Sequence, residues 1–117
     1  MTVFWVALGG ALGAVGRYSM SLIVVGVTAT LMVNVVGSFL IGLAFVLLWE
    51  KGLDRFMPFV VTGVLGGFTT FSAFSLDAFR LFEDGRMSEA VFYVFGSVVL
   101  SISAAVFAIW LARGLTA

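Results

Sequence analysis

The chain has 117 residues, of which 62% are hydrophobic and 10% are charged, and its formal net charge at pH 7 is zero. A soluble domain of this length cannot bury so large a share of apolar side chains, so the composition predicts an all-α integral membrane protein. The absence of cysteine and histidine excludes disulfides, thiolate metal sites and the usual proton carrier at neutral pH. There is no basic stripe to bind nucleic acid and no catalytic constellation, so we expect a protein that is not an enzyme.

Charged residues divide the chain into four hydrophobic spans, each long enough to cross the ~30 Å hydrocarbon core of a bilayer. We predict transmembrane helices over residues 3–23, 25–49, 56–82 and 87–112 of a single domain, residues 1–117. The N-terminus lacks the basic n-region of a signal peptide, so the first span is expected to remain in the membrane. The join between the first two spans is short and uncharged, which leaves that boundary the least defined.

The basic residues are evenly distributed over the predicted topology. An even number of spans gives three on each side: Lys51, Arg55 and Arg113 with the termini, and Arg17, Arg80 and Arg86 opposite. The positive-inside rule therefore selects no orientation. Chance balance among few charges is one interpretation; dual topology, with copies inserted in both orientations, is the other. Because four helices enclose little volume, we expect an oligomer and favour an antiparallel homodimer.

The first span carries closely spaced glycines and one arginine. Gly9 and Gly13 have the small-xxx-small spacing that allows close helix contact. A phosphate-binding loop is excluded because no Lys-Ser/Thr pair follows. Arg17 has two interpretations, an anchor that snorkels to the interface or a charge that attracts anions to a vestibule.

Polar residues share one stripe of the second span. Thr30, Asn34 and Ser38 follow the spacing i, i+4, i+8 and so lie on one helix face. An isolated Asn can hydrogen-bond between helices, or its amide can face a pore. Three polar side chains in one stripe favour the pore.

The third span is longer than a straight crossing requires and contains two adjacent glycines. A break near Gly66–Thr70 would take up the excess length and free backbone carbonyls at membrane depth. Carbonyls that face each other across a dimer axis would suit a small hard cation.

After this break, Phe71 and Phe74 are three residues apart and can point the same way. Their ring edges carry positive potential that can face an anion, and Ser72 and Ser75 add hydroxyl donors at the same spacing. Asp77 follows, either as a solvated end charge or as a partner for Arg80.

The fourth span repeats the i, i+4, i+8 pattern with Tyr93, Ser97 and Ser101. Each serine can instead bond to a carbonyl of its own helix. The shared register makes a donor track the more informative interpretation.

Three motifs together carry a resemblance to a known family. They are Gly13-Ala14-x-x-Arg17-Tyr18, Thr30-Leu31-x-x-Asn34-x-x-Gly37-Ser38, and Gly66-Gly67-x-Thr69-Thr70-Phe71-Ser72-x-Phe74-Ser75. In a four-span chain this combination resembles the Fluc (CrcB) family of fluoride channels over essentially the whole length.

The resemblance implies an antiparallel, dual-topology homodimer in the inner (plasma) membrane that exports fluoride passively through two pores and protects the cell from fluoride. It also implies a structural Na⁺ held by backbone carbonyls of Gly66 and Thr69. The implied pore residues are Phe71, Phe74, Asn34, Thr30, Ser72, Tyr93, Ser97 and Ser101, and Arg17 matches the family's first-span arginine. Passive flux is also favoured because no carboxylate lies at mid-membrane and no nucleotide motif is present.

Several departures keep other functions open. Ala73 and Ala105 stand at or near positions where the family often has a hydroxyl, and Asp77 stands where it often has Glu. A heterodimer of two related chains is one alternative. A small multidrug-type exporter is another, although it requires a first-span carboxylate that this chain lacks. An assembly subunit without transport activity is a third.

Overall fold

The computed structural model describes residues 1–117, and the chain is helical throughout, without a strand. The helices in chain order are α1 (Thr2–Ile23), α2 (Val27–Ala44), the π-helix η1 (Phe45–Glu50), the 3₁₀-helix η2 (Asp54–Phe56), the π-helix η3 (Pro58–Leu65), α3 (Gly66–Phe68), α4 (Phe71–Glu83) and α5 (Met87–Thr116).

Four helical stretches are long and apolar enough to cross a membrane: Thr2–Ile23, Val27–Glu50, Asp54–Glu83 and Met87–Thr116. The prediction of four membrane-capable helices is confirmed, and the last helix continues past the predicted end at Ala112 to Thr116. Only 17 of the 117 residues are buried, and large apolar side chains such as Leu40, Phe79 and Phe92 are exposed on different helices. An exposed apolar surface of this extent requires lipid as solvent.

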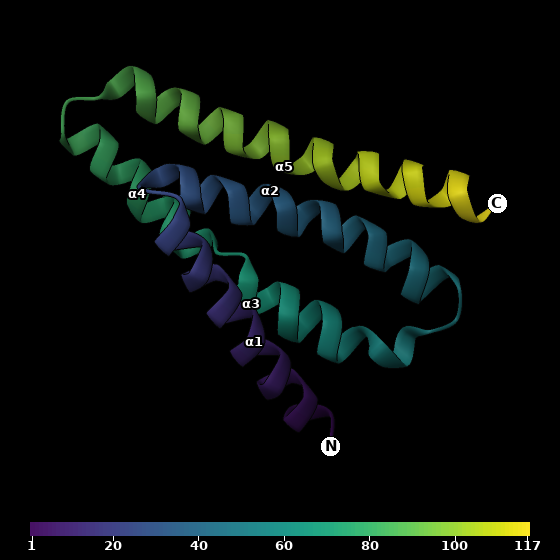
Figure 1. The fold of residues 1–117 in the computed structure, drawn as a ribbon. Coiled ribbons are helices and arrows are strands. Elements are labelled where there is room, and N and C mark those ends of the chain that lie inside the picture. Colours follow the sequence, from purple (N-terminus) through teal and green to yellow (C-terminus); the bar gives the residue numbers. More distant parts are fainter.

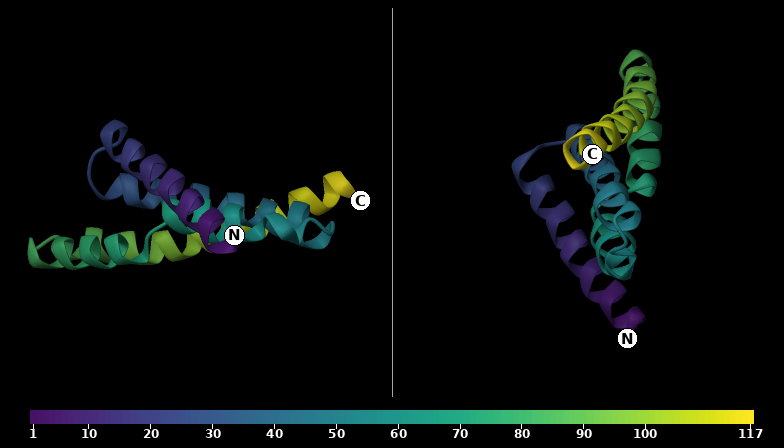
Figure 2. Two further views of the ribbon diagram at one scale, coloured as in Figure 1. Left: turned by 90° about the horizontal axis from the view of Figure 1, so that it is seen from below. Right: turned by 90° about the vertical axis from the view of Figure 1, so that its right-hand side faces the viewer.

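The helices form a flattened body that measures 49 × 33 × 20 Å along its principal axes. The second stretch, α2 with η1, lies between α5 on one side and η3 on the other, while α1 crosses η3 and α3 obliquely (Figure 1). The views in Figure 2 show that α1 leaves the layer formed by the other helices. The second stretch therefore contacts α5 on one side and the third stretch, Asp54–Glu83, on the other.

The short join between the first two spans is a turn at Val24–Gly26, and α2 begins at Val27, two residues later than predicted. Gly26 has φ +77°, which L-residues with a side chain rarely adopt. With this glycine, the chain connects α1 to α2 through only the three residues 24–26, without a polar loop.

Close packing of α1 against the third stretch depends on glycines, as predicted for Gly9 and Gly13. A Cβ at Gly13 would lie 2.0 Å from the carbonyl oxygen of Val64, and one at Gly9 would lie 2.5 Å from that of Phe59. The two backbones thus touch directly, which side chains on either helix would prevent.

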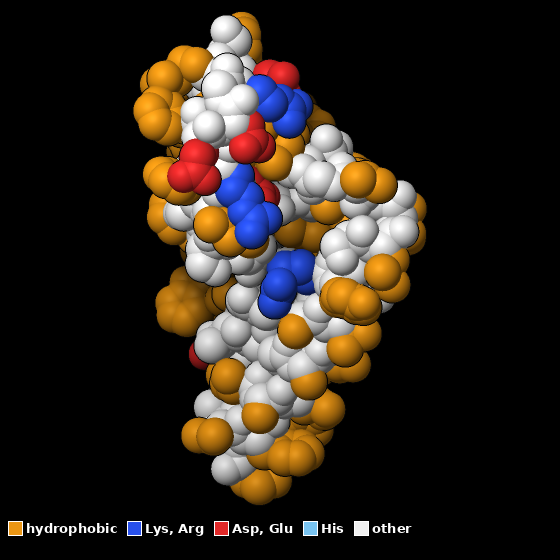
Figure 3. Space-filling model, turned by 90° about the vertical axis from the view of Figure 1, so that its left-hand side faces the viewer, with side chains coloured by type: hydrophobic (Ala, Val, Ile, Leu, Met, Phe, Trp, Pro, Cys, Tyr) orange, Lys and Arg blue, Asp and Glu red, His pale blue; other side chains and the backbone are white.

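Charged side chains gather at the helix ends. Figure 3, which shows the side that includes the turn between α4 and α5, has acidic and basic groups together in its upper part, a further basic group near the middle, and hydrophobic and other uncharged groups below. Arg86 pairs there with Glu89, and at the other end Arg113 Nε donates to Glu50 at 3.1 Å. Because both ion pairs are exposed to solvent, they add little to the stability of the fold.

Candidate functional site

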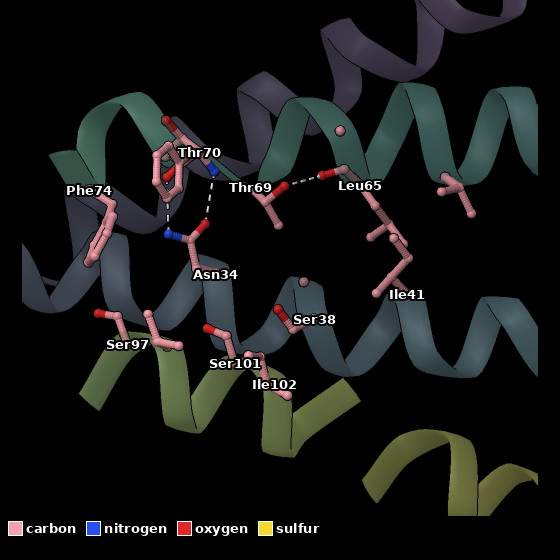
Figure 4. A pocket seen from close by; sticks show the side chains of 15 residues that line it. Asn34, Ser38, Ile41, Leu65, Thr69, Thr70, Phe74, Ser97, Ser101 and Ile102 are labelled. Atoms are coloured by element: carbon pink, nitrogen blue, oxygen red, sulfur yellow. Dashed lines mark hydrogen bonds between the residues drawn. The ribbon is translucent and has the colours of Figure 1, made fainter. Parts of the chain in front are cut away.

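A groove of about 390 Å³ runs between α2, α5 and the third stretch at the point where α3 ends (Figure 4). Its polar lining residues are Asn34, Ser38, Thr69, Thr70, Ser97 and Ser101, and its apolar lining includes Ile41, Val61, Leu65, Phe71, Phe74, Val98 and Ile102. No charged side chain lines it. The groove is therefore largely apolar, with hydroxyl, amide and aromatic groups among its lining and no charged side chain.

The segment Thr69–Thr70 has extended backbone between two helices. Thr69 has ψ 157°, and Thr70 has φ −153° and ψ 116°. Gly66 and Gly67 lie three and two residues before Thr69 and have low helix propensity, so they weaken the helix before this segment. Thr70 then caps α4, because its Oγ1 accepts a hydrogen bond from the Ala73 N–H at 3.1 Å.

This geometry withdraws the helical hydrogen-bond donors from two carbonyls. In a continuous α-helix the Gly66 carbonyl would accept from the Thr70 N–H, and the Thr69 carbonyl from the Ala73 N–H. Here the Thr70 N–H donates to Asn34 Oδ1 at 2.8 Å, and the Ala73 N–H donates to Thr70 Oγ1. The oxygens of both carbonyls therefore remain free to bind another group. Carbonyl oxygens are the type of ligand that a hard cation needs.

Asn34 binds both polar groups of the Thr70 backbone. Its Oδ1 accepts from the Thr70 N–H, and its Nδ2 donates to the Thr70 carbonyl at 3.0 Å (Figure 4). This is the one amide orientation that pairs each donor with an acceptor. Nδ2 carries a second proton, so Asn34 retains one donor for the groove.

An aromatic row runs along one wall of the site. The Phe71 and Phe74 ring centroids are 5.5 Å apart, and those of Phe74 and Tyr93 are 5.3 Å apart. Phe74 is buried, whereas Phe71 is 78% exposed in the single chain. One side of the Phe71 ring is thus free to contact lipid or another protein chain.

Ser97 of α5 has the one buried side-chain oxygen or nitrogen that lacks a hydrogen-bond partner. Ser97 Oγ is buried and has no hydrogen-bond partner, and Ser101 lines the groove one turn further along the helix. Ser38 of α2, which shares the polar stripe with Asn34, also lines the groove. A buried hydroxyl without a partner carries a free-energy cost of about 1–3 kcal/mol, which a polar ligand would relieve.

Three of the predicted pore residues lie outside the groove lining. Ser72 is exposed, and its hydroxyl contacts that of Thr70 at 3.2 Å. Thr30 lies one turn before Asn34 on α2, away from the lining. The Tyr93 hydroxyl donates to Asp77 Oδ2 at 3.1 Å, so Asp77 pairs with Tyr93 and makes no ion pair with Arg80.

Arg17 lies at the junction of α1 and α3. It is partly buried, and its Nε donates to the Gly67 carbonyl at 3.1 Å. The remaining guanidinium N–H groups make no bond within the chain, so the residue combines a structural contact with a free positive edge. Neither interpretation from the sequence included this carbonyl as its partner.

Ala73 and Ala105, which stand at or near positions where the family often has a hydroxyl, each have a defined backbone contact. Ala73 supplies the N–H that Thr70 caps. The carbonyl of Ala105 lies 2.5 Å from where a Cβ of Gly42 would be, at the contact of α2 with α5. The aliphatic lining residues, such as Ile41, Val98 and Ile102, carry no distinguishing sequence signal, because the same residue types cover the exposed surfaces.

Four membrane-capable helical stretches, three of which line a groove without charged side chains, define a multi-pass helical membrane protein. Residues 4–109 match the family model described as CrcB-like protein, Camphor Resistance (CrcB), and the chain belongs to this family. Relatives named "Fluoride-specific ion channel FluC" include one from Paracoccus denitrificans (strain Pd 1222) that is 46% identical, with 99% of this chain and 98% of the relative aligned. Another, from Ruegeria sp. (strain TM1040), is 50% identical over 97% and 96% of the two chains. One from Cereibacter sphaeroides (strain ATCC 17029 / ATH 2.4.9) is 55% identical over 84% and 83%.

Proposed function

We propose that this protein is a fluoride-selective channel that lets F⁻ leave the cytoplasm passively across the inner (plasma) membrane and so protects against fluoride toxicity. The observation that carries the proposal is the buried, unpartnered hydroxyl of Ser97 in a groove without charged side chains. Relatives that are named fluoride-specific ion channels support fluoride as the ion.

The groove has the donors that fluoride needs. A small anion holds its hydration water strongly, so a conducting path must replace that water with hydrogen-bond donors at each step. Ser97 and Ser101 offer hydroxyls, Asn34 offers its second amide proton, and Phe71 and Phe74 offer ring edges of positive potential. No Lys or Arg side chain lines the groove, so no side-chain ion pair would hold the anion in place and slow its release.

The working unit in this proposal is an antiparallel pair of chains inserted in opposite orientations. The large exposure of Phe71 supports it, because a second copy would cover the open side of this ring. The backbone carbonyls of Gly66 and Thr69 are the groups that would hold Na⁺, since their regular helical donors are engaged elsewhere. A bound Na⁺ would supply a fixed positive charge that links the two copies.

The test uses purified chain in liposomes loaded with potassium fluoride. After valinomycin is added, a fluoride electrode should record rapid F⁻ efflux, with little efflux from liposomes loaded with chloride. Ser97→Ala should lower the initial efflux rate by about ten- to a hundredfold, because a hydrogen bond to a charged group contributes about 1.5–3 kcal/mol. Its melting temperature should stay the same or rise, since the substitution removes an unpaired buried hydroxyl.

The matched control is Ser19→Ala. The Ser19 hydroxyl is exposed and donates to the Val15 carbonyl of its own helix, far along the chain from the groove residues. Its efflux should equal that of the wild type. Efflux at the background of empty liposomes would contradict the homodimeric channel, and recovery only after a related chain is added would replace it with a heterodimer.

A further inference from the structure

The break in the third stretch is stabilised by two side chains, one from α2 and one from the break itself. Asn34 Oδ1 accepts a hydrogen bond from the Thr70 N–H, and the Thr70 hydroxyl accepts one from the Ala73 N–H. These are the N–H groups that would otherwise return to the carbonyls of Gly66 and Thr69 and restore a continuous helix. Each freed carbonyl thus corresponds to one captured donor.

The same face of α2 also fixes the conformation of Thr69. Gly37 lies three residues after Asn34, and a Cβ there would lie 2.2 Å from Cγ2 of Thr69. The Thr69 hydroxyl donates to the Leu65 carbonyl at 2.9 Å, so this side chain is directed back along its own helix. Because the hydroxyl of Thr69 is engaged in this bond, its backbone carbonyl is the group that remains to bind a ligand.

We infer that Asn34 and Thr70 are positioning residues for a cation: by capturing the N–H groups of Thr70 and Ala73, they keep the carbonyls of Gly66 and Thr69 free to bind Na⁺. This inference rests on the proposed function for the identity of the cation. Asn34 then has two roles, since its Oδ1 and one amide proton hold the break while the second proton remains for the groove. The fluoride path and the cation site are joined through a single side chain.

The first measurement is the melting temperature of the purified protein in detergent, in sodium chloride or in N-methylglucamine chloride at equal ionic strength. Sodium that binds only the folded protein should raise the melting temperature of the wild type, increasingly with concentration. Thr70→Val keeps the shape but loses the hydroxyl, so the Ala73 N–H can return to the Thr69 carbonyl and the sodium-dependent rise should be lost. Thr70→Ser keeps the cap and should keep the rise.

Asn34→Leu should abolish the sodium-dependent rise in the same way, because the Thr70 N–H then has only the Gly66 carbonyl to bind. A rise of wild-type size in both Thr70→Val and Asn34→Leu would overturn the inference. Absence of any rise in the wild type would overturn it as well. Fluoride efflux of the wild type is recorded separately, so a failed channel and a failed cation site give different results.

A second measurement needs no destabilising variant. Thr69-Thr70 is the one Thr-Thr pair in the sequence, so protein labelled with ¹³C,¹⁵N-threonine gives a single carbonyl-to-nitrogen NMR cross peak for the Thr69 carbonyl and the Thr70 nitrogen. This cross peak should move when N-methylglucamine is replaced by sodium. A cross peak that does not respond to sodium would contradict a freed, cation-binding Thr69 carbonyl.

Discussion

Tyr93 of α5 donates a hydrogen bond from its hydroxyl to Oδ2 of Asp77 on α4, at 3.1 Å. The Tyr93 ring packs on Phe74, so the bond and the aromatic contact together fix α4 against α5 beside the groove. Tyr93 therefore acts on the groove through the orientation of Phe74, and not as part of its lining.

Removal of this bond should destabilise the protein modestly. We expect Tyr93→Phe to lower the free energy of unfolding by about 1–2 kcal/mol, since a hydrogen bond to a charged, half-exposed group is lost. Asp77→Asn keeps an oxygen that can accept from Tyr93 and should cost less. Melting temperatures of both single variants and of the double variant give the coupling; additive losses would mean that the two side chains do not interact.

The two phenylalanines of the site should respond differently to the same substitution. Phe71 is 78% exposed and Phe74 is 8% exposed, and Phe74 packs on both Phe71 and Tyr93. Phe74→Ile should therefore lower both the melting temperature and the fluoride efflux. Phe71→Ile should lower the efflux and should lower the melting temperature less than Phe74→Ile does, because few contacts within the chain are lost.

Electrode traces and melting curves of the same preparations check this contrast. A drop in melting temperature for Phe71→Ile as large as that for Phe74→Ile would contradict this difference between an exposed and a buried ring. Wild-type efflux from Phe71→Ile would remove this ring from the proposed path.

The helices and the glycine contacts could be predicted from the sequence because hydropathy and small-xxx-small spacing are local signals. The sequence range Gly66–Thr70 includes the extended pair Thr69–Thr70, since adjacent glycines and a capping threonine are also local. Asn34 could be predicted to matter but not to bind the Thr70 backbone. That bond joins residues 36 positions apart, and no periodicity encodes such a pairing.

Tyr93 shows the limit of periodicity in another way. Its i, i+4, i+8 relation to Ser97 and Ser101 predicts a shared helix face, but where each side chain ends depends on its length. The tyrosine reaches past the groove to Asp77, whereas the short Ser97 hydroxyl stops at the groove wall without a partner. Residues in one register can therefore have different environments.

The glycines of α1 allow a matched test of helix contact. A Cβ at Gly13 would meet the backbone of Val64 at 2.0 Å and that of Phe68 at 2.8 Å, whereas a Cβ at Gly10 would meet nothing within 4 Å. Gly13→Ala should therefore destabilise the protein by about 1–3 kcal/mol or more, because neither backbone can yield without moving a helix. Gly10→Ala should be neutral or stabilising by up to about 1 kcal/mol, since Ala favours the helix.

Melting temperature in detergent distinguishes these glycines. Equal losses for the two variants would contradict the packing of α1 described here. A loss for Gly10→Ala alone would indicate that the face of α1 which is open in the single chain meets a second copy.

The contact of Gly37 with Thr69 permits a reciprocal rescue. Gly37→Ala would bring its Cβ within 2.2 Å of Thr69 Cγ2, while its next nearest neighbours, Phe68 Cδ2 and Thr69 Cβ, remain at 3.5 and 3.7 Å. The clash thus involves one methyl group. Thr69→Ser deletes this methyl and keeps the hydroxyl that donates to Leu65.

We expect Gly37→Ala alone to lower the melting temperature and the fluoride efflux, because Thr69 and its carbonyl are displaced. The double variant Gly37→Ala, Thr69→Ser should recover most of both, and Thr69→Ser alone should stay close to the wild type. Four melting curves and four efflux traces complete the cycle. If the double variant is as impaired as Gly37→Ala, the harm arises elsewhere on α2, and Gly37 does not fix the position of Thr69.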